Sequence, residues 1–212
     1  MFMLLQEAKM FDFKKTVMMI NWFARQCFGK SEDKLDLLKM IYMADRFHLR
    51  KYGRLISGDT YYAMNLGPVP SMTKTICDSP NKLSSEQKEF AYSFLQILGD
   101  KIHSLKWSEE QYFCPSEIEA LNEARKKATF VKQSGVNLPD FTHQFPEWQL
   151  YRKFLTKTSS RRKMNILKFF SELNDSKKDL EYCLISSRLL QSNKQKFMER
   201  QAIEKMIANI HE

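Results

Sequence analysis

The residues of this 212-residue chain best suited to acid–base chemistry lie close together on one predicted helix. Asp45 and His48 are three residues apart, a spacing that places two side chains on the same face of a helix. A carboxylate beside an imidazole can transfer protons, as in a general acid–base pair. The alternative is a buried network that joins this helix to the loop after it. We favour the network, because no nucleophile, oxyanion site or metal ligand accompanies the pair.

The helix that carries this pair is apolar over most of its circumference, as expected for a helix at the centre of a fold. It is predicted to be capped by Ser31, to run to about Lys51 and to stop at Gly53. We expect one narrow charged stripe to face water. That stripe consists of Asp36, Lys39, Arg46 and Arg50.

Asp45 falls on the opposite side of the same helix, which is predicted to be buried. A buried carboxylate without hydrogen-bond partners costs several kcal/mol. We therefore expect Asp45 to bind backbone N–H groups of the adjoining loop.

That loop holds a large share of the glycine and proline in the chain. Gly58, Gly67, Pro68 and Pro70 fall within 13 residues. Such a loop can cradle a phosphate, but we favour glycines at positive φ and a fixed turn at Gly67-Pro68. A short strand over 60–66 would then present residues of types common at interfaces. These candidate contact residues are Tyr61, Tyr62 and Met64.

Most of the net charge of +9 comes from one segment. Residues 148–171 hold seven Lys or Arg and no acidic residue, whereas residues 1–147 sum to +2. The simplest interpretation is a solvated face, or a solvated linker over 156–160 between helices. The alternatives are a surface for an acidic partner and a nucleic-acid footprint, whose affinity would fall steeply with salt. The candidate partner-binding residues of this segment are Arg152, Lys153, Arg161, Arg162 and Lys163.

The composition favours long helices, because glycine and proline together number only 12. We predict a mainly α fold, in which a compact helical domain with a small β-hairpin or short sheet precedes a helical C-terminal extension. The hairpin is expected over 103–107 and 111–114. The helices are expected over 13–27, 71–77, 84–98, 115–130, 164–173 and 177 to the end, with a break at 191–196.

Several classes of protein are not indicated. The first residues lack the basic start of a signal peptide, and no apolar run is long enough for a membrane helix. The sequence has no CxxC pair, HExxH, Walker loop, GxGxxG or GxSxG, so we expect no metal, no cofactor and no enzymatic activity. The scattered cysteines indicate buried thiols in a reducing compartment. They are Cys27, Cys77, Cys114 and Cys183.

Two groups of residues form a spaced pattern. The first block comprises Lys34, Leu38, Tyr42, Asp45, His48, Gly53, Gly58, Tyr61, Gly67 and Pro68. The later element comprises Thr142, His143 and Trp148. This pattern resembles the Panacea domain, the SocA-like antitoxin family. The likeness covers about residues 13–150. It divides the chain into a Panacea-like domain over 1–150 and a basic join with a helical extension over 151–212.

The resemblance implies an antitoxin that neutralises a co-encoded toxin by direct contact in the cytoplasm. Some members of the family are thought to pass the toxin to a cytoplasmic protease, which is therefore a second partner to consider. A nucleic-acid-binding regulator that uses residues 151–168 is the alternative function, and a membrane partner is not expected.

Overall fold

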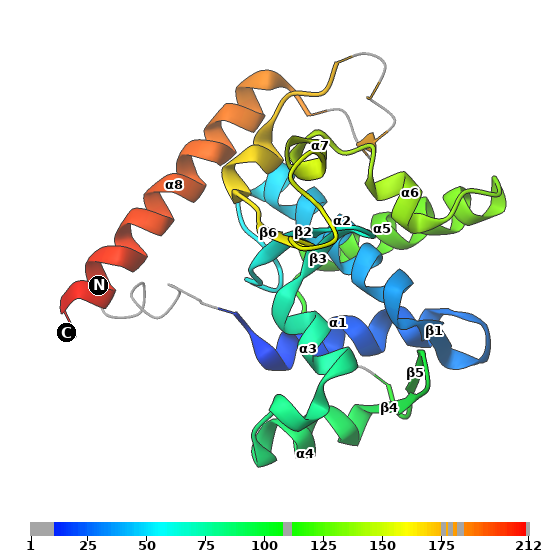
Figure 1. Cartoon of the computed structure of the whole chain (residues 1–212). Helices are drawn as coiled ribbons and strands as arrows, with labels where there is room; N and C mark the ends of the chain where they lie inside the picture. Colours follow the sequence, from blue (N-terminus) through cyan, green and yellow to red (C-terminus); the bar gives the residue numbers. More distant parts are fainter. Residues whose placement is uncertain (1–10, 108–111, 175–176, 178–179, 182–184, 211–212) are drawn as a thin grey trace.

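The structure of the chain is a computed structural model that describes residues 11–107, 112–174, 177, 180–181 and 185–210 (Figure 1). The described part is mainly α-helical, with two small antiparallel sheets, as the sequence predicts. Its helices are α1 (Phe13–Gln26), α2 (Lys34–Tyr52), α3 (Ser71–Asp78), α4 (Ser85–Phe94), α5 (Pro115–Gln133), α6 (Leu138–Thr142), α7 (Pro146–Arg152) and α8 (Ser187–Ile210). Its strands are β1 (Ser31–Asp33), β2 (Tyr61–Met64), β3 (Gly67–Pro70), β4 (Leu95–Leu98), β5 (Lys101–Ser104) and β6 (Arg161–Lys163). Among these helices, none is both long and apolar enough to cross a bilayer.

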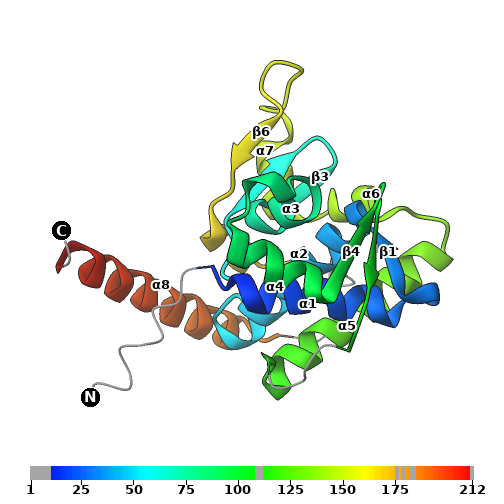
Figure 2. The same cartoon turned by 90° about the horizontal axis from the view of Figure 1, so that it is seen from below.

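Helix α2 is the centre of the fold: α1, α3, α5, α6 and α8 pack against it, and α4 packs against α1 (Figures 1 and 2). Every residue from Leu37 to Arg50 is buried, which confirms the prediction of a central helix. The prediction that the charged stripe of α2 faces water is wrong for three of its four residues. Lys39 and Arg46 are fully buried and Arg50 is only 3% exposed, because β3 covers Lys39, α7 covers Arg46 and the chain after β6 covers Arg50.

The first sheet has the order β1-β5-β4 and lies beside α1 (Figure 2). The hairpin predicted over 103–107 and 111–114 is wrong, since β5 pairs with β4 across the turn at Gly99. Ile97 and Leu98 therefore belong to a strand and not to the preceding helix. Ser31 likewise pairs with His103 in β1 and does not cap α2. Residues 108–111 of the predicted hairpin lie outside the described residues.

The second sheet has the order β3-β2-β6 and joins two distant parts of the sequence. β2 confirms the predicted strand, but Gly67 and Pro68 start β3, so the turn lies before them at 65–66. Arg161–Lys163 is a strand that pairs with Tyr62–Met64. Residues 156–160 before it are largely exposed and lie outside helices and strands, as predicted for a linker, but they lead into this strand and not into a helix. The backbone N–H of Met164 also donates to the carbonyl of Tyr61 at 2.9 Å.

After β6 the chain packs against the core, and the final helix then extends away from it. The predicted helix over 164–173 is a short 3-10 turn, η5 (Ile166–Phe170), which buries Phe169 and Phe170. The final helix starts at Ser187 and not near 177, and it continues through 191–196 without the predicted break. Leu190, Asn193 and Phe197 anchor it, and the rest of α8 extends away from the body (Figures 1 and 2).

The cysteines only partly match the prediction of buried thiols. Cys77 is buried, whereas Cys27 is half-buried and Cys114 is exposed. Burial raises the pKa of Cys77 to about 12, so its thiol is protonated and unreactive. Cys183 lies outside the described residues.

Candidate partner-binding site

The carboxylate of Asp45 fastens α2 to the loop that precedes β2. Its Oδ1 accepts hydrogen bonds from the backbone N–H of Ile56 at 2.6 Å and of Ser57 at 3.0 Å. Its Oδ2 accepts from the hydroxyl groups of Ser57 and, at 2.7 Å, of Tyr61. Burial raises the pKa of Asp45, and these donors act against that rise. The predicted burial and the predicted backbone donors are both confirmed.

His48 is buried on the same helix but does not contact Asp45. Its Nδ1 lies 2.9 Å from the carbonyl oxygen of Arg54, so this nitrogen carries the proton and donates. Its Nε2 then accepts from the hydroxyl of Ser116 at 3.0 Å. Burial lowers the pKa of His48 to about 4, so the ring is neutral at physiological pH. The two side chains do not form an acid–base pair.

A second buried network covers the stripe of α2 that was predicted to be wet. Arg46 Nε donates to Glu147 at 2.7 Å, and the hydroxyl of Tyr42 donates to the same carboxylate oxygen at 2.6 Å. Glu181 pairs with both Arg46 and Arg50. Arg50 also donates to the carbonyl of Phe169 at 2.6 Å. Sequence reasoning missed this network, although arginines on an otherwise apolar helix were its signal.

The later motif element holds the β2–β3 turn in place. Trp148 Nε1 donates to the carbonyl of Met64 at 3.1 Å, and the ring of His143 stacks on Trp148 with centroids 4.0 Å apart. Gly67 has φ +98°, and a Cβ there would lie only 2.7 Å from Thr142 Oγ1. Glycine is therefore required at this position. The element predicted from Thr142, His143 and Trp148 packs directly against the hairpin.

Lys39 completes this support from the side of α2. Its Nζ donates to the carbonyl of Pro68 at 3.0 Å. Burial lowers the pKa of Lys39 to about 7.

The remaining motif residues have structural positions. Lys34 forms an ion pair with Asp78 at 3.8 Å, and Leu38 lies in the core. Gly53 ends α2 at φ +76°, and Gly58 has φ +67° in the loop, as the glycine prediction requires.

The outer face of the second sheet gathers candidate partner-binding residues from two segments. Successive residues of a strand point to opposite faces, and paired residues of neighbouring strands share a face. Tyr62 is paired with Lys163, and Met64 with Arg161. All four side chains are at least partly exposed. Tyr61 points the other way and is fully buried, so its predicted role as a contact residue is wrong.

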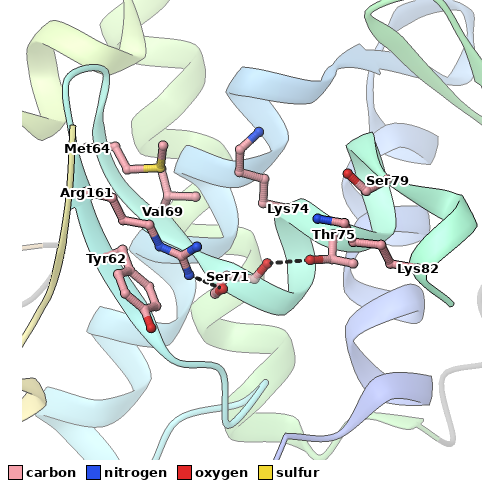
Figure 3. Close-up of a pocket in the computed structure, with 9 residues that line it drawn as sticks. All are labelled: Tyr62, Met64, Val69, Ser71, Lys74, Thr75, Ser79, Lys82 and Arg161. Carbon is pink, nitrogen blue, oxygen red and sulfur yellow. Dashed lines mark hydrogen bonds between the residues drawn. The ribbon is translucent and has the colours of Figure 1, made fainter. Parts of the chain in front are cut away.

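A small pocket of about 130 Å³ opens on this face beside α3 (Figure 3). The guanidinium of Arg161 lies over the ring of Tyr62, 3.6 Å from its centroid, and donates to Ser71 Oγ at 2.8 Å. We call this surface the cationic face. Its residues are Tyr62, Met64, Val69, Ser71, Lys74, Thr75, Ser79, Lys82 and Arg161, which line the pocket, together with Lys163, which is paired with Tyr62 and lines a second, larger groove.

A family model described as antitoxin SocA-like, Panacea domain, matches residues 37–149. The chain belongs to this family. The match contains Asp45, the β2–β3 hairpin and Trp148, whereas Lys34 and the strand β6 lie outside it. No curated protein and no solved structure matched the chain.

The other candidate residues of the basic segment lie apart from the pocket. Arg152 and Lys153 are exposed at the end of α7, just beyond the matched Panacea domain. Arg162 is exposed but alternates to the opposite side of β6 from Arg161. None of these three side chains lines the pocket.

A larger groove of about 600 Å³ lies between α8 and the loop before β2. Two of its cations, Lys15 and Arg54, are already paired with Glu117 at 2.9 and 2.7 Å. Its other cations are Arg200 and Lys163, and its lining also includes the acidic residues Asp12, Asp59 and Glu204. The groove therefore lacks the one-sided charge of the cationic face.

One acidic group among the described residues of this Panacea protein has oxygens close enough to hold a metal ion. It consists of Glu32, Asp33 and Asp36, whose ligand atoms lie within 4.8 Å of one another. The ammonium of Lys132 already binds Glu32 at 2.9 Å and Asp36 at 2.5 Å. Two of the three carboxylates are thus already paired with a side chain of the protein itself.

Proposed function

We propose that this protein is an antitoxin that neutralises a toxin by direct, non-catalytic binding, and that the cationic face is its binding surface. Membership of the SocA-like antitoxin family supports the antitoxin role. The observation that carries the choice of surface is the pairing of β6 with β2. This pairing places Arg161 and Lys163 beside Tyr62 and Met64, about 100 residues away in sequence.

The contacts on the inner side of the β2–β3 hairpin support this choice. The Asp45 and Trp148 contacts hold the β2–β3 hairpin from inside and leave its outer face uncovered. A rigid platform with an exposed Arg stacked on a partly exposed Tyr, beside a partly exposed Met, is well suited to protein recognition, because little conformational entropy is lost on binding. We place the complex in the cytoplasm, and delivery of the toxin to a protease stays a prediction.

The test is co-expression with each neighbouring open reading frame. We expect one neighbour to arrest growth alone and not together with this chain. The double variant Arg161→Glu, Lys163→Glu should then lose neutralisation and co-purification with the toxin. The double variant Arg152→Glu, Lys153→Glu makes the same charge change outside the pocket and should retain both. The proposal is contradicted if no neighbouring open reading frame is toxic, or if both double variants lose neutralisation equally.

Nucleic-acid binding is the competing use of the basic segment. Unpaired bases stack on aromatic side chains in such sites, but the ring of Tyr62 is already covered by Arg161. Gel shifts at two salt concentrations distinguish the two uses. Binding that is tight at low salt and falls by orders of magnitude with a few-fold rise in salt would favour a nucleic-acid partner.

A further inference from the structure

We propose that the pocket beside Arg161 seats a carboxylate side chain, an aspartate or glutamate of the toxin. This inference rests on the proposed function and names the chemistry by which the cationic face recognises its partner. It concerns a pocket whose third strand, β6, lies outside the matched family domain.

The pocket has a one-sided set of polar groups (Figure 3). Its lining includes three cations and four hydroxyl groups, and none of its nine described residues is acidic. Lys74 is paired with Asp78 on its own helix, whereas Arg161 and Lys82 form no ion pair with any residue that the structure describes, so these two supply most of the pocket's free positive charge. An anion is the ligand that this charge distribution favours.

The guanidinium of Arg161 is held in place for such a ligand. Stacking on Tyr62 fixes its plane, and the bond to Ser71 uses one of its five N–H donors. The remaining donors form a planar fork that matches the two oxygens of a carboxylate. The apolar side chains of Met64 and Val69 lie next to it and can contact the methylene groups of a glutamate or aspartate.

A phosphate is disfavoured because the backbone donors of this region are already used. Phosphate sites at helix N-termini depend on free backbone N–H groups. At the start of α3 the N–H of Ser71 donates to Thr60, and those of Met72 and Thr73 donate to Asp59 at 2.9 and 2.8 Å. Only side chains are left to hold an anion, which suits a carboxylate.

The size of the pocket and the covered aromatic ring also exclude a nucleobase. A pocket of about 130 Å³ is smaller than the ~300–1,000 Å³ of typical small-molecule sites. It accommodates one side-chain group and not a base with its sugar.

The first experiment uses the full chain alone and does not require the toxin. Backbone and arginine N–H signals are followed by NMR while acetyl-Gly-Glu-Gly-amide is added, with the Gln peptide and inorganic phosphate added separately at equal ionic strength. We expect the Glu peptide to shift the signals of Ser71, Thr75 and Arg161, and the Gln peptide to leave them unchanged.

Two matched variants locate the effect. Arg161→Gln should weaken binding of the Glu peptide by about tenfold or more, the loss expected for a charge-assisted hydrogen bond. Arg162→Gln removes the same charge from the adjacent residue on the other side of β6 and should change the affinity by less than about twofold. The proposal is overturned by equal shifts with both peptides, by tighter binding of phosphate, or by equal effects of the two variants.

A second experiment tests the assignment in the complex. Arg161→Glu should abolish neutralisation, and toxin mutants selected to be neutralised by this variant should carry Lys or Arg in place of an Asp or Glu. Suppressors that never replace an acidic residue would overturn the inference. If no neighbouring gene is toxic, the proposed function fails, whereas the peptide experiment still decides whether the pocket binds a carboxylate.

Discussion

The buried networks around α2 and the cationic face use similar residue types in opposite ways. Arg46 is fully buried and paired with Glu147 and Glu181. Arg161 is exposed and lies in a pocket that has no acidic lining residue. The comparison shows that the same side chain fixes the fold where the chain supplies its counter-ion and is available for a partner where it does not. Changes to the buried networks should therefore act on stability, and changes to the cationic face on binding.

The largest effect is expected for Arg46→Leu. The change leaves the buried carboxylate of Glu147 without its cation and removes one of the two arginines paired with Glu181, so the free energy of unfolding should fall by about 3–5 kcal/mol. Chemical denaturation measures this loss. Arg46→Lys keeps the charge and should lose less. A fall below about 1 kcal/mol for the Leu variant would mean that the network contributes little to the fold.

Asp45→Ala should have the next largest effect. It removes the acceptor of four hydrogen bonds and leaves the backbone N–H groups of Ile56 and Ser57 unpaired in the core. We expect a loss of about 2–3 kcal/mol and a fall in Tm of several degrees by calorimetry. Asp45→Asn retains the size of the side chain and one acceptor oxygen, so its stability should lie between that of the original protein and that of Asp45→Ala. Unchanged stability in the Ala variant would contradict the structural role.

Lys39 adds a pH dependence to the buried region. Its pKa is lowered to about 7 in the fold from an ordinary value of 10.5, so between these pH values the unfolded chain binds one more proton than the folded protein. The contribution of Lys39 to the free energy of unfolding therefore rises with pH, by at most about 1.4 kcal/mol per pH unit between pH 7 and 10.

Lys39→Met isolates this effect, because Met fills a similar space without titrating. The unfolding free energy of the original protein should increase relative to that of Lys39→Met as the pH is raised from 7 to 10. Parallel pH curves for the two proteins would show that the burial of Lys39 has no such consequence.

These residues also show what sequence reasoning could and could not reach. Periodicity correctly identified α2 as central and Asp45 as buried, because both depend on local spacing. It failed for Arg46, since the exposure of that stripe depends on Glu147 and Glu181, over 100 residues away. It failed for β6 for the same reason: three charged residues have no strand pattern of their own, and only the open edge of β2 makes them a strand.

Gly67→Ala should have a smaller effect on stability. The new Cβ would lie 2.7 Å from Thr142 Oγ1 and 3.1 Å from Lys39 Nζ at a positive φ, so we expect a loss of about 1–3 kcal/mol. Gly99→Ala is the matched control, since Gly99 has φ +57° with nothing within 4 Å of the added Cβ. The free energy of unfolding of Gly99→Ala should fall by only about 1 kcal/mol, the cost of a positive φ. Equal losses, measured by urea denaturation, would mean that the contact with Thr142 does not constrain the hairpin.

The smallest effect on stability, and the sharpest test of the comparison, is expected for Arg161→Gln. The side chain is exposed, and its contacts with Tyr62 and Ser71 lie at the surface, so the unfolding free energy should change by less than about 1 kcal/mol. Neutralisation of the toxin should nevertheless be reduced, because the pocket loses its fixed cation. Stability is measured by denaturation and neutralisation by growth of cells that co-express both proteins. A variant that loses as much stability as Asp45→Ala would place Arg161 with the buried networks, and the division between scaffold and binding surface would fail at its central residue.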